Sequence, residues 1–277
     1  MVFRVFSCRA VVWCWVLWPF VLLLFHPPAW SAFEFRPVGA RSGGLGDTFV
    51  GLASGAEGVF WNPGSVGLGR GLRAVGGYER PFGMAELETQ VLGVVVPLGR
   101  HALGFSYQGY GFVLYRERAV GVTYGYAFSK RLGLGVRVRG LQVVVAELKD
   151  RRWTVFDLGI QARLRADLIL GLAAWNASGK AVGVLGQGGL LGVGVAVGHD
   201  VWVLADVRKE AGTPTGAGMG LEYRFGSRAA LRAGAGAHPE RMAVGLGIGK
   251  GSVGVDYAAV WHAVLGVSHR VSVRFGE

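Results

Sequence analysis

The sequence predicts an all-β protein, a transmembrane antiparallel barrel of about fourteen strands in a single closed sheet. Three observations support this fold class. Apolar and polar residues alternate along nearly the whole chain after residue 70, and a period of two is that of a β-strand. No helical pattern interrupts the alternation. A segment typical of an export signal precedes it, and exported chains of this pattern are typical of bacterial outer membranes.

The first element, residues 1–32, has the features of a signal peptide. Two arginines lie among the first nine residues, residues 10–25 form an apolar run, and residues 29–32 offer small side chains for cleavage after Ser31 or Ala32. The alternative is a retained membrane anchor, but the run is short for a span of about 20 residues. We therefore expect an exported chain in the outer membrane of a Gram-negative bacterium.

Composition argues against disulfides, thiolate metal sites and membrane-spanning helices in the mature chain. Both cysteines, Cys8 and Cys14, lie in the signal, so the mature chain is expected to have no disulfide and no thiolate metal site. No later run reaches the roughly 18 apolar residues of a membrane helix, yet 51% of the chain is hydrophobic. That hydrophobicity is spread by alternation, as in a barrel with a lipid-facing exterior.

Charge bears on possible partners. The formal net charge is +11, which in a soluble domain would suggest nucleic acid. The basic residues are spaced along strands rather than clustered, and an exported chain does not meet nucleic acid, so we expect no nucleic-acid partner. Arginines in a lumen or at the lipid and lipopolysaccharide headgroups are the better account. The barrel assembly machinery is a further expected partner.

Residues 33–70 form the second element, a Gly-rich and irregular stretch that is too short to have its own core. A turn signal, Asn62-Pro63-Gly64, lies near its end. We expect a compact plug with one or two short helical turns, packed inside or under the barrel. Its candidate residues are Gly39, Arg41, Gly44, Trp61, Asn62 and Pro63.

Residues 71–277 form the third element, the barrel. Most of its predicted strands are near or above the 9–11 residues that a tilted membrane strand needs. The predicted strands are 71–79, 86–98, 101–112, 117–128, 131–146, 153–165, 167–177, 186–198, 200–208, 215–226, 228–237, 241–250, 252–262 and 267–276. Connections after even-numbered strands are very short and most of the others are longer. Outer-membrane barrels have this asymmetry, with the short turns in the periplasm.

The alternation also assigns the two faces. Apolar rows such as Met242, Val244, Leu246 and Ile248 are expected to face lipid, because a charge there costs about 2–4 kcal/mol at mid-membrane. The opposite rows hold small and charged residues. The expected lumen-facing residues are Arg137, Arg139, Asp157, Arg163, Arg165, Asp206, Arg208, Glu222, Arg224, Arg232, Asp256, Arg270 and Arg274.

Two interpretations of this charged lining remain open. It is either a salt-bridged surface that fixes the plug, or a selectivity surface for anions and polar headgroups. Asp256 is expected to pair with a neighbouring arginine such as Arg270 or Arg232, because an unpaired buried carboxylate would cost stability.

Catalysis and bound cofactors are not expected. Ser268 and His269 are adjacent on one strand and face opposite sides, so they cannot form a nucleophile–base pair. No His-x-x-x-His spacing occurs that would suggest a metal site, and the glycine-rich runs lie within strands rather than at the strand-to-helix turns of phosphate loops.

Two motifs at opposite ends of the chain resemble the PorV/PorQ family, relatives of the FadL-type outer-membrane proteins. The first is Gly-Ala-Arg-Ser-Gly-Gly-Leu-Gly-Asp-Thr-Phe-Val-Gly-Leu-Ala at 39–53, followed by Phe-Trp-Asn-Pro at 60–63. The second comprises Leu-Arg-Ala-Gly at 231–234, Val-Asp-Tyr-Ala at 255–258 and Leu-Gly-Val-Ser-His-Arg-Val-Ser at 265–272. The chain departs from the family at 54–55, where an acidic pair is usual, and lacks the long loops of its large members.

The resemblance implies two functions from different classes. The FadL-like expectation is passive transport of small hydrophobic molecules across the outer membrane, with Trp61-Asn62-Pro63 acting as a mobile hatch rather than a simple anchored turn. The PorV/PorQ-like expectation is a non-catalytic accessory or docking component of type IX protein secretion, with a secretion-system protein as partner.

Overall fold

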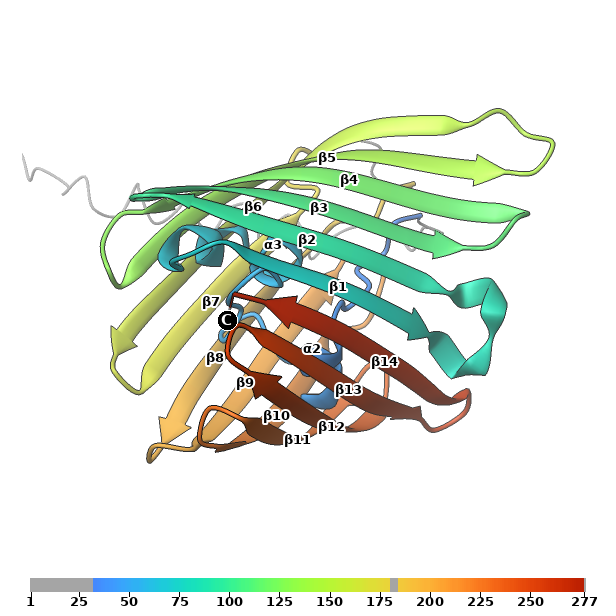
Figure 1. The fold of residues 1–277 in the computed structure, drawn as a ribbon. Coiled ribbons are helices and arrows are strands. Elements are labelled where there is room, and N and C mark those ends of the chain that lie inside the picture. Colours follow the sequence, from blue (N-terminus) through green and yellow to red (C-terminus); the bar gives the residue numbers. More distant parts are fainter. Residues whose placement is uncertain (1–31, 180–183, 277) are drawn as a thin grey trace, which may run out of the picture.

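The computed structural model of the chain, which describes residues 32–179 and 184–276, is a closed barrel of fourteen antiparallel strands around a short N-terminal segment (Figure 1). Strands follow one another around the barrel in chain order, and β1 pairs with β14 to close it. The expected signal peptide lies outside the described residues except for Ala32. In the described part of the chain, no helix is long and apolar enough to cross a bilayer.

All fourteen predicted strands are confirmed, most with boundaries shifted by one or two residues. The largest difference precedes β2, where residues 85–87 form a 3-10 turn instead of extended strand. The strands are β1 (Arg73–Arg80), β2 (Thr89–Leu98), β3 (His101–Gly111), β4 (Tyr115–Ala127), β5 (Leu132–Val145), β6 (Arg151–Arg165), β7 (Leu168–Trp175), β8 (Gly188–Val197), β9 (Val201–Glu210), β10 (Gly216–Phe225), β11 (Ala229–Ala237), β12 (Arg241–Lys250), β13 (Val253–His262) and β14 (Gly266–Phe275).

The register places apolar side chains on the outside of the barrel. In β12, Met242, Val244, Leu246 and Ile248 are all exposed, and the side chains between them are small. The closing pair of strands keeps this parity, with Ala74 opposite Phe275 and Arg80 opposite His269. A slip by one residue would bring the interior charges onto lipid, so the two faces determine the register.

The two ends of the barrel differ. One end carries the short turns, such as Gly99-Arg100 between β2 and β3, and the other carries the longer connections, such as 81–88 and 176–187. Strands β4, β5 and β6 are the longest, with 13, 14 and 15 residues. Their hairpins extend past the neighbouring strands at the long-loop end (Figure 1). The chain enters β1 and leaves β14 at the short-turn end.

The N-terminal segment, residues 33–70, lies in the barrel interior, and we call it the inner segment. It holds α2 (Ala40–Gly44), α3 (Gly58–Trp61) and the 3-10 helix η1 (Pro63–Leu68). Helix α2 contacts β11 to β14, α3 contacts β2 and β3, and η1 contacts β3 to β7. Nearly all residues from 38 to 67 are buried. Side chains from this segment and from the strand interiors together form the main apolar core.

Candidate functional site: the lumen and the inner segment

The inner segment fits the barrel because the strands present glycines to it. A methyl group on Gly93 would lie 2.9 Å from the ring of Phe60, and one on Gly104 would lie 2.7 Å from Val59. Strand backbone and inner segment therefore approach more closely than any side chain would allow. The same holds around the lumen at Gly125, Gly135, Gly159, Gly171, Gly220, Gly234 and Gly245.

The turn at Asn62 also fixes the segment. The Oδ1 atom of Asn62 accepts a hydrogen bond from the Gly64 amide at 3.0 Å, which caps η1, and its Nδ2 donates to the carbonyl of Ile160 at 3.0 Å. Trp61 is buried and donates from its indole to the carbonyl of Val38 at 2.8 Å. The Trp-Asn-Pro motif thus joins two parts of the inner segment to each other and to β6.

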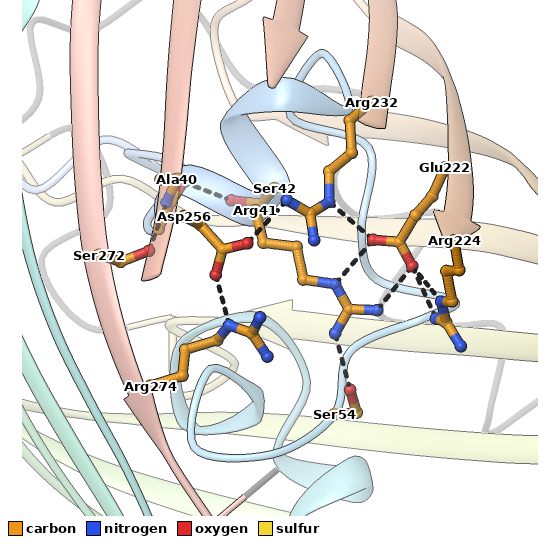
Figure 2. Close-up of polar contacts among 11 residues, drawn as sticks. Ala40, Arg41, Ser42, Ser54, Glu222, Arg224, Arg232, Asp256, Ser272 and Arg274 are labelled. Atoms are coloured by element: carbon orange, nitrogen blue, oxygen red, sulfur yellow. Dashed lines mark hydrogen bonds and ion pairs between the residues drawn. The ribbon is translucent and has the colours of Figure 1, made fainter. Parts of the chain in front are cut away.

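A ladder of ion pairs crosses the interior on β10, β11, β13 and β14 (Figure 2). Glu222 is at its centre and binds Arg41 of α2 through two contacts of 3.0 Å. Glu222 also binds Arg232 at 2.7 Å and Arg224 at 2.6 Å. The ladder continues from Arg232 to Asp256 at 2.7 Å, and Asp256 also pairs with Arg274. Arg41 is the link between the inner segment and this ladder.

The expected pairing of Asp256 is therefore partly correct. Arg232 and Arg274 bind this carboxylate, whereas Arg270 reaches Asp47 of the inner segment and Glu79 of β1. Figure 2 shows Asp256 between its two arginines. The difference arises because Asp256 lies opposite Ser272 of β14, and Arg270 is two residues further toward the long-loop end. At that height, Arg270 binds Asp47 instead.

Two further carboxylates contact the inner segment directly. Asp206 accepts hydrogen bonds from the backbone amides of Phe49 and Val50 at 2.6 and 2.9 Å. Glu117 accepts from the amide of Phe33 at 3.2 Å and pairs with Arg36. Acids on the strands therefore bind the inner segment through its backbone as well as its side chains.

A third ion-pair cluster lies on the opposite wall. Asp157 binds Arg137 at 2.7 Å and Arg139 at 2.6 Å, and it also accepts the amide of Asn176 at 2.8 Å. Arg137 donates in addition to the carbonyl of Val59 in α3. These strand residues thus support the inner segment from β5 and β6.

The residues expected to face the lumen have different environments in the structure. The buried group comprises Arg137, Asp157, Asp206, Glu222, Arg232, Asp256 and Arg270, and the partly buried group comprises Arg139, Arg208, Arg224 and Arg274. Arg163 and Arg165 differ from the expectation. Their positions in β6 have the same parity as the interior residues, but they lie at the short-turn end of the strand, beside a register shift, and are exposed. Arg165 pairs there with Asp167. The plug residues Gly39, Arg41, Gly44, Trp61, Asn62 and Pro63 are all buried.

Sequence reasoning missed Asp47, an acid of the inner segment that binds Arg270 of β14, and two strand acids that bind the inner segment, Glu117 and Glu210. Glu210 accepts the amide of Phe35 at 3.2 Å. Glu117 and Glu210 both occupy interior positions in their strands, so the alternation contained the signal, but each is close to a strand end where the pattern weakens. In the described part of the chain, no group of three His, Cys, Asp or Glu side chains is placed to hold a metal.

Aromatic side chains gather where the inner segment begins. The ring of Phe35 stacks on Trp175 of β7 at 4.8 Å and meets Trp61 edge-on at 5.3 Å. Phe49 also meets Trp61 edge-on, at 5.8 Å. This cluster packs the start of the inner segment against β7 and against α3.

A cavity lies on either side of the inner segment. At the long-loop end, a cavity of about 480 Å³ is lined by Phe35, Phe82, Val260 and four prolines, together with charged residues of both signs. At the short-turn end, a cavity of about 530 Å³ is lined mainly by arginines and glycines. The inner segment contributes residues to the lining of both cavities and lies between them.

By sequence, the chain matches no family model and no curated protein. By structure, it is similar to the CymD monoaromatic hydrocarbon channel, with 14% identity, 89% of this chain and 99% of that chain covered, and a TM-score of 0.64. It is also similar to the toluene transporter TbuX of Ralstonia pickettii (13% identity, 88% and 98% covered, TM-score 0.63). A FadL homologue of Pseudomonas aeruginosa gives 10% identity, 89% and 100% coverage and a TM-score of 0.61.

At these identities, the likeness establishes the fold of the chain. It is a closed fourteen-stranded transmembrane barrel with a short helical N-terminal segment, like those of the FadL-type outer-membrane channels.

Proposed function

We propose that the protein is an outer-membrane channel for passive uptake of small hydrophobic molecules. The single observation that supports this most strongly is the cavity of about 480 Å³ at the long-loop end, with Phe35, Phe82 and Val260 in its lining. Its volume is within the range of small-molecule sites, and its wall combines these apolar side chains and the prolines with four acids and three arginines. The structural relatives described as hydrocarbon and toluene channels agree with this class of cargo.

The position of the cavity at the long-loop end suits entry of a hydrophobic molecule from the cell surface. The long connections of outer-membrane barrels are extracellular and the short turns are periplasmic, so the cavity at the long-loop end opens toward the outside. A molecule bound there is separated from the short-turn chamber by the inner segment. Passage requires the inner segment to shift, which is the hatch role that its Trp-Asn-Pro turn would serve. Folding into the outer membrane would rely on the barrel assembly machinery, after an N-terminal signal has directed export.

The test replaces one side chain in the cavity wall. Val260 is buried in the cavity lining, and Ala259 beside it points outward. Val260→Trp should fill the cavity and lower the rate of radiolabelled toluene uptake several-fold in cells whose only such channel is this protein. Ala259→Trp places the same group toward lipid and should leave uptake unchanged. Equal uptake by cells with either variant and by cells without the protein would contradict the proposal.

One observation favours the second function, docking in type IX secretion as in PorV/PorQ proteins. Large apolar side chains are exposed on connections at the long-loop end, with Val113 78%, Leu148 67% and Val264 84% exposed. A partner protein could cover them. Val113→Asp with Val264→Asp should then reduce release of secreted cargo while toluene uptake stays unchanged, and the reverse pattern would exclude docking.

A further inference from the structure

The chamber at the short-turn end has an unusual charge. Seven arginines line it, two from the inner segment, two from β10 and the turn after it, and one each from β1, β11 and β14. A single acid, Glu222, lines it with them. The other chamber has four acids and three arginines in its lining and is close to neutral. The positive charge is therefore specific to one end of the lumen.

The ion-pair ladder neutralises only part of this charge. Glu222 is shared by three of the seven arginines, and Asp256, behind the lining, is shared by two (Figure 2). Arg70 and Arg228, at the mouth of the chamber, have no ion pair among the residues that the structure describes. Arg70 and Arg228 thus add positive charge that no carboxylate of the described residues pairs with, which leaves a positive potential inside a low-dielectric wall.

The size of the chamber indicates what would balance that potential. A volume of about 530 Å³ is within the range of pockets for organic ligands and far above the needs of a single halide ion. Guanidinium groups bind carboxylate and phosphate oxygens in pairs, with planar and directed hydrogen bonds. A ligand with several such groups can contact arginines from the inner segment and from the strands at once.

We infer that the short-turn chamber is a binding site for a small, multiply charged anion bearing carboxylate or phosphate groups. The site is distinct from the cavity at the long-loop end, and its existence does not depend on the transport proposal. Because Arg41 and Arg70 belong to the inner segment, a bound anion cross-links this segment to the barrel wall and holds the lumen closed.

Binding can be measured by titration calorimetry on the purified protein in a non-ionic detergent at low salt. The probes are tricarballylate and pyrophosphate, which distinguish a polycarboxylate from a phosphate ligand, and acetate serves as the monovalent comparison. We expect saturable binding of one tricarballylate or one pyrophosphate per chain, an affinity that falls steeply with added salt, and much weaker binding of acetate. Absence of saturable binding by either multivalent probe would overturn the inference, as would equal affinity for acetate.

Two double variants locate the site. Arg70→Gln with Arg228→Gln removes two cations that have no ion pair in the described chain, and we expect the affinity to fall about ten-fold or more. Arg163→Gln with Arg165→Gln removes the same charge from the same end of the barrel, outside the chamber lining, and should leave the affinity unchanged. Heat modifiability on a gel checks that both variants are folded. An equal loss of affinity in the two would show that binding follows overall charge and would refute the site.

Discussion

A methyl group on Gly44 would lie 2.8 Å from the Cα of Gly245, and a methyl group on Gly245 would lie 2.8 Å from the Cα of Gly44. The two glycines bring the backbone of α2 directly against the backbone of β12. Real Cβ atoms do not approach other atoms this closely, so any larger residue at either position must displace the helix from the wall.

The first prediction tests this contact. Gly245→Ala should loosen the inner segment at a cost of about 1–3 kcal/mol, the usual penalty for overpacking a tight interior. Limited trypsin digestion reports it, because cleavage after the buried Arg41 requires the segment to move. Gly249→Ala is the matched control on the same face of the same strand, where the nearest atom would be 3.4 Å away. If both variants resist trypsin like the parent protein, the close contact does not fix α2.

The second prediction concerns the centre of the ion-pair ladder. Glu222→Gln removes the carboxylate shared by Arg41, Arg224 and Arg232, and leaves buried arginines without their counter-charge. Loss of one partner of a buried pair costs about 3–5 kcal/mol, so the temperature of heat modification should fall and trypsin should cut after Arg41. Glu240→Gln, on an exposed connection, should change neither. Unaltered protection in Glu222→Gln would show that glycine packing alone retains the segment.

The third prediction uses the outward face. Val136 is at the middle of the apolar row of β5, and Leu132 is at its short-turn end. Val136→Arg should reduce assembly into the outer membrane, because an arginine costs about 2–4 kcal/mol at the bilayer midplane, whereas Leu132→Arg should cost about 0–1 kcal/mol near the interface. Quantifying the heat-modifiable form in membrane fractions measures both. Equal assembly of the two variants would place the membrane elsewhere on the barrel.

Alternation determined which parts of the fold could be predicted. Each strand has an apolar face that must meet lipid, so rows such as Met242 to Ile248 predict their strand and its register from the sequence alone. The alternation of short and long connections then predicted the two ends. No comparable period exists in residues 33–70, so the positions of α2, α3 and η1 could not be predicted beyond one or two helical turns.

The site was predicted less completely because parity gives the face of a residue and not its height in the lumen. Parity placed Asp256 and Arg270 in the interior. One of the two acids that bind Arg270 is Asp47 of the inner segment, whose position a pattern confined to strands does not predict. The same limit explains Arg163 and Arg165, which have interior parity and yet lie at an exposed strand end. Glu117 binds Arg36 across 81 positions of sequence, and only the folded chain brings them together.

The last prediction concerns closure of the lumen. A fourteen-stranded barrel is too wide for its own side chains to fill, and the inner segment occupies the interior between the two chambers. The intact protein should therefore conduct little in a planar bilayer. A variant lacking residues 39–68 keeps every strand, including the pairing of β1 with β14, and should conduct much more. Its conductance should favour anions, because the deletion removes only Arg41 and the chamber at the short-turn end keeps six of its seven arginines.

Two controls make this result decisive. Heat modifiability shows whether the shortened protein is folded, and Arg70→Gln with Arg228→Gln in the shortened protein should reduce the anion preference without reducing the conductance. Large conductance from the intact protein would mean that the inner segment does not close the lumen and would favour a general porin. A folded, shortened protein that still conducts nothing would place the barrier in the strands or in residues 33–38, because α2, α3 and η1 would be gone.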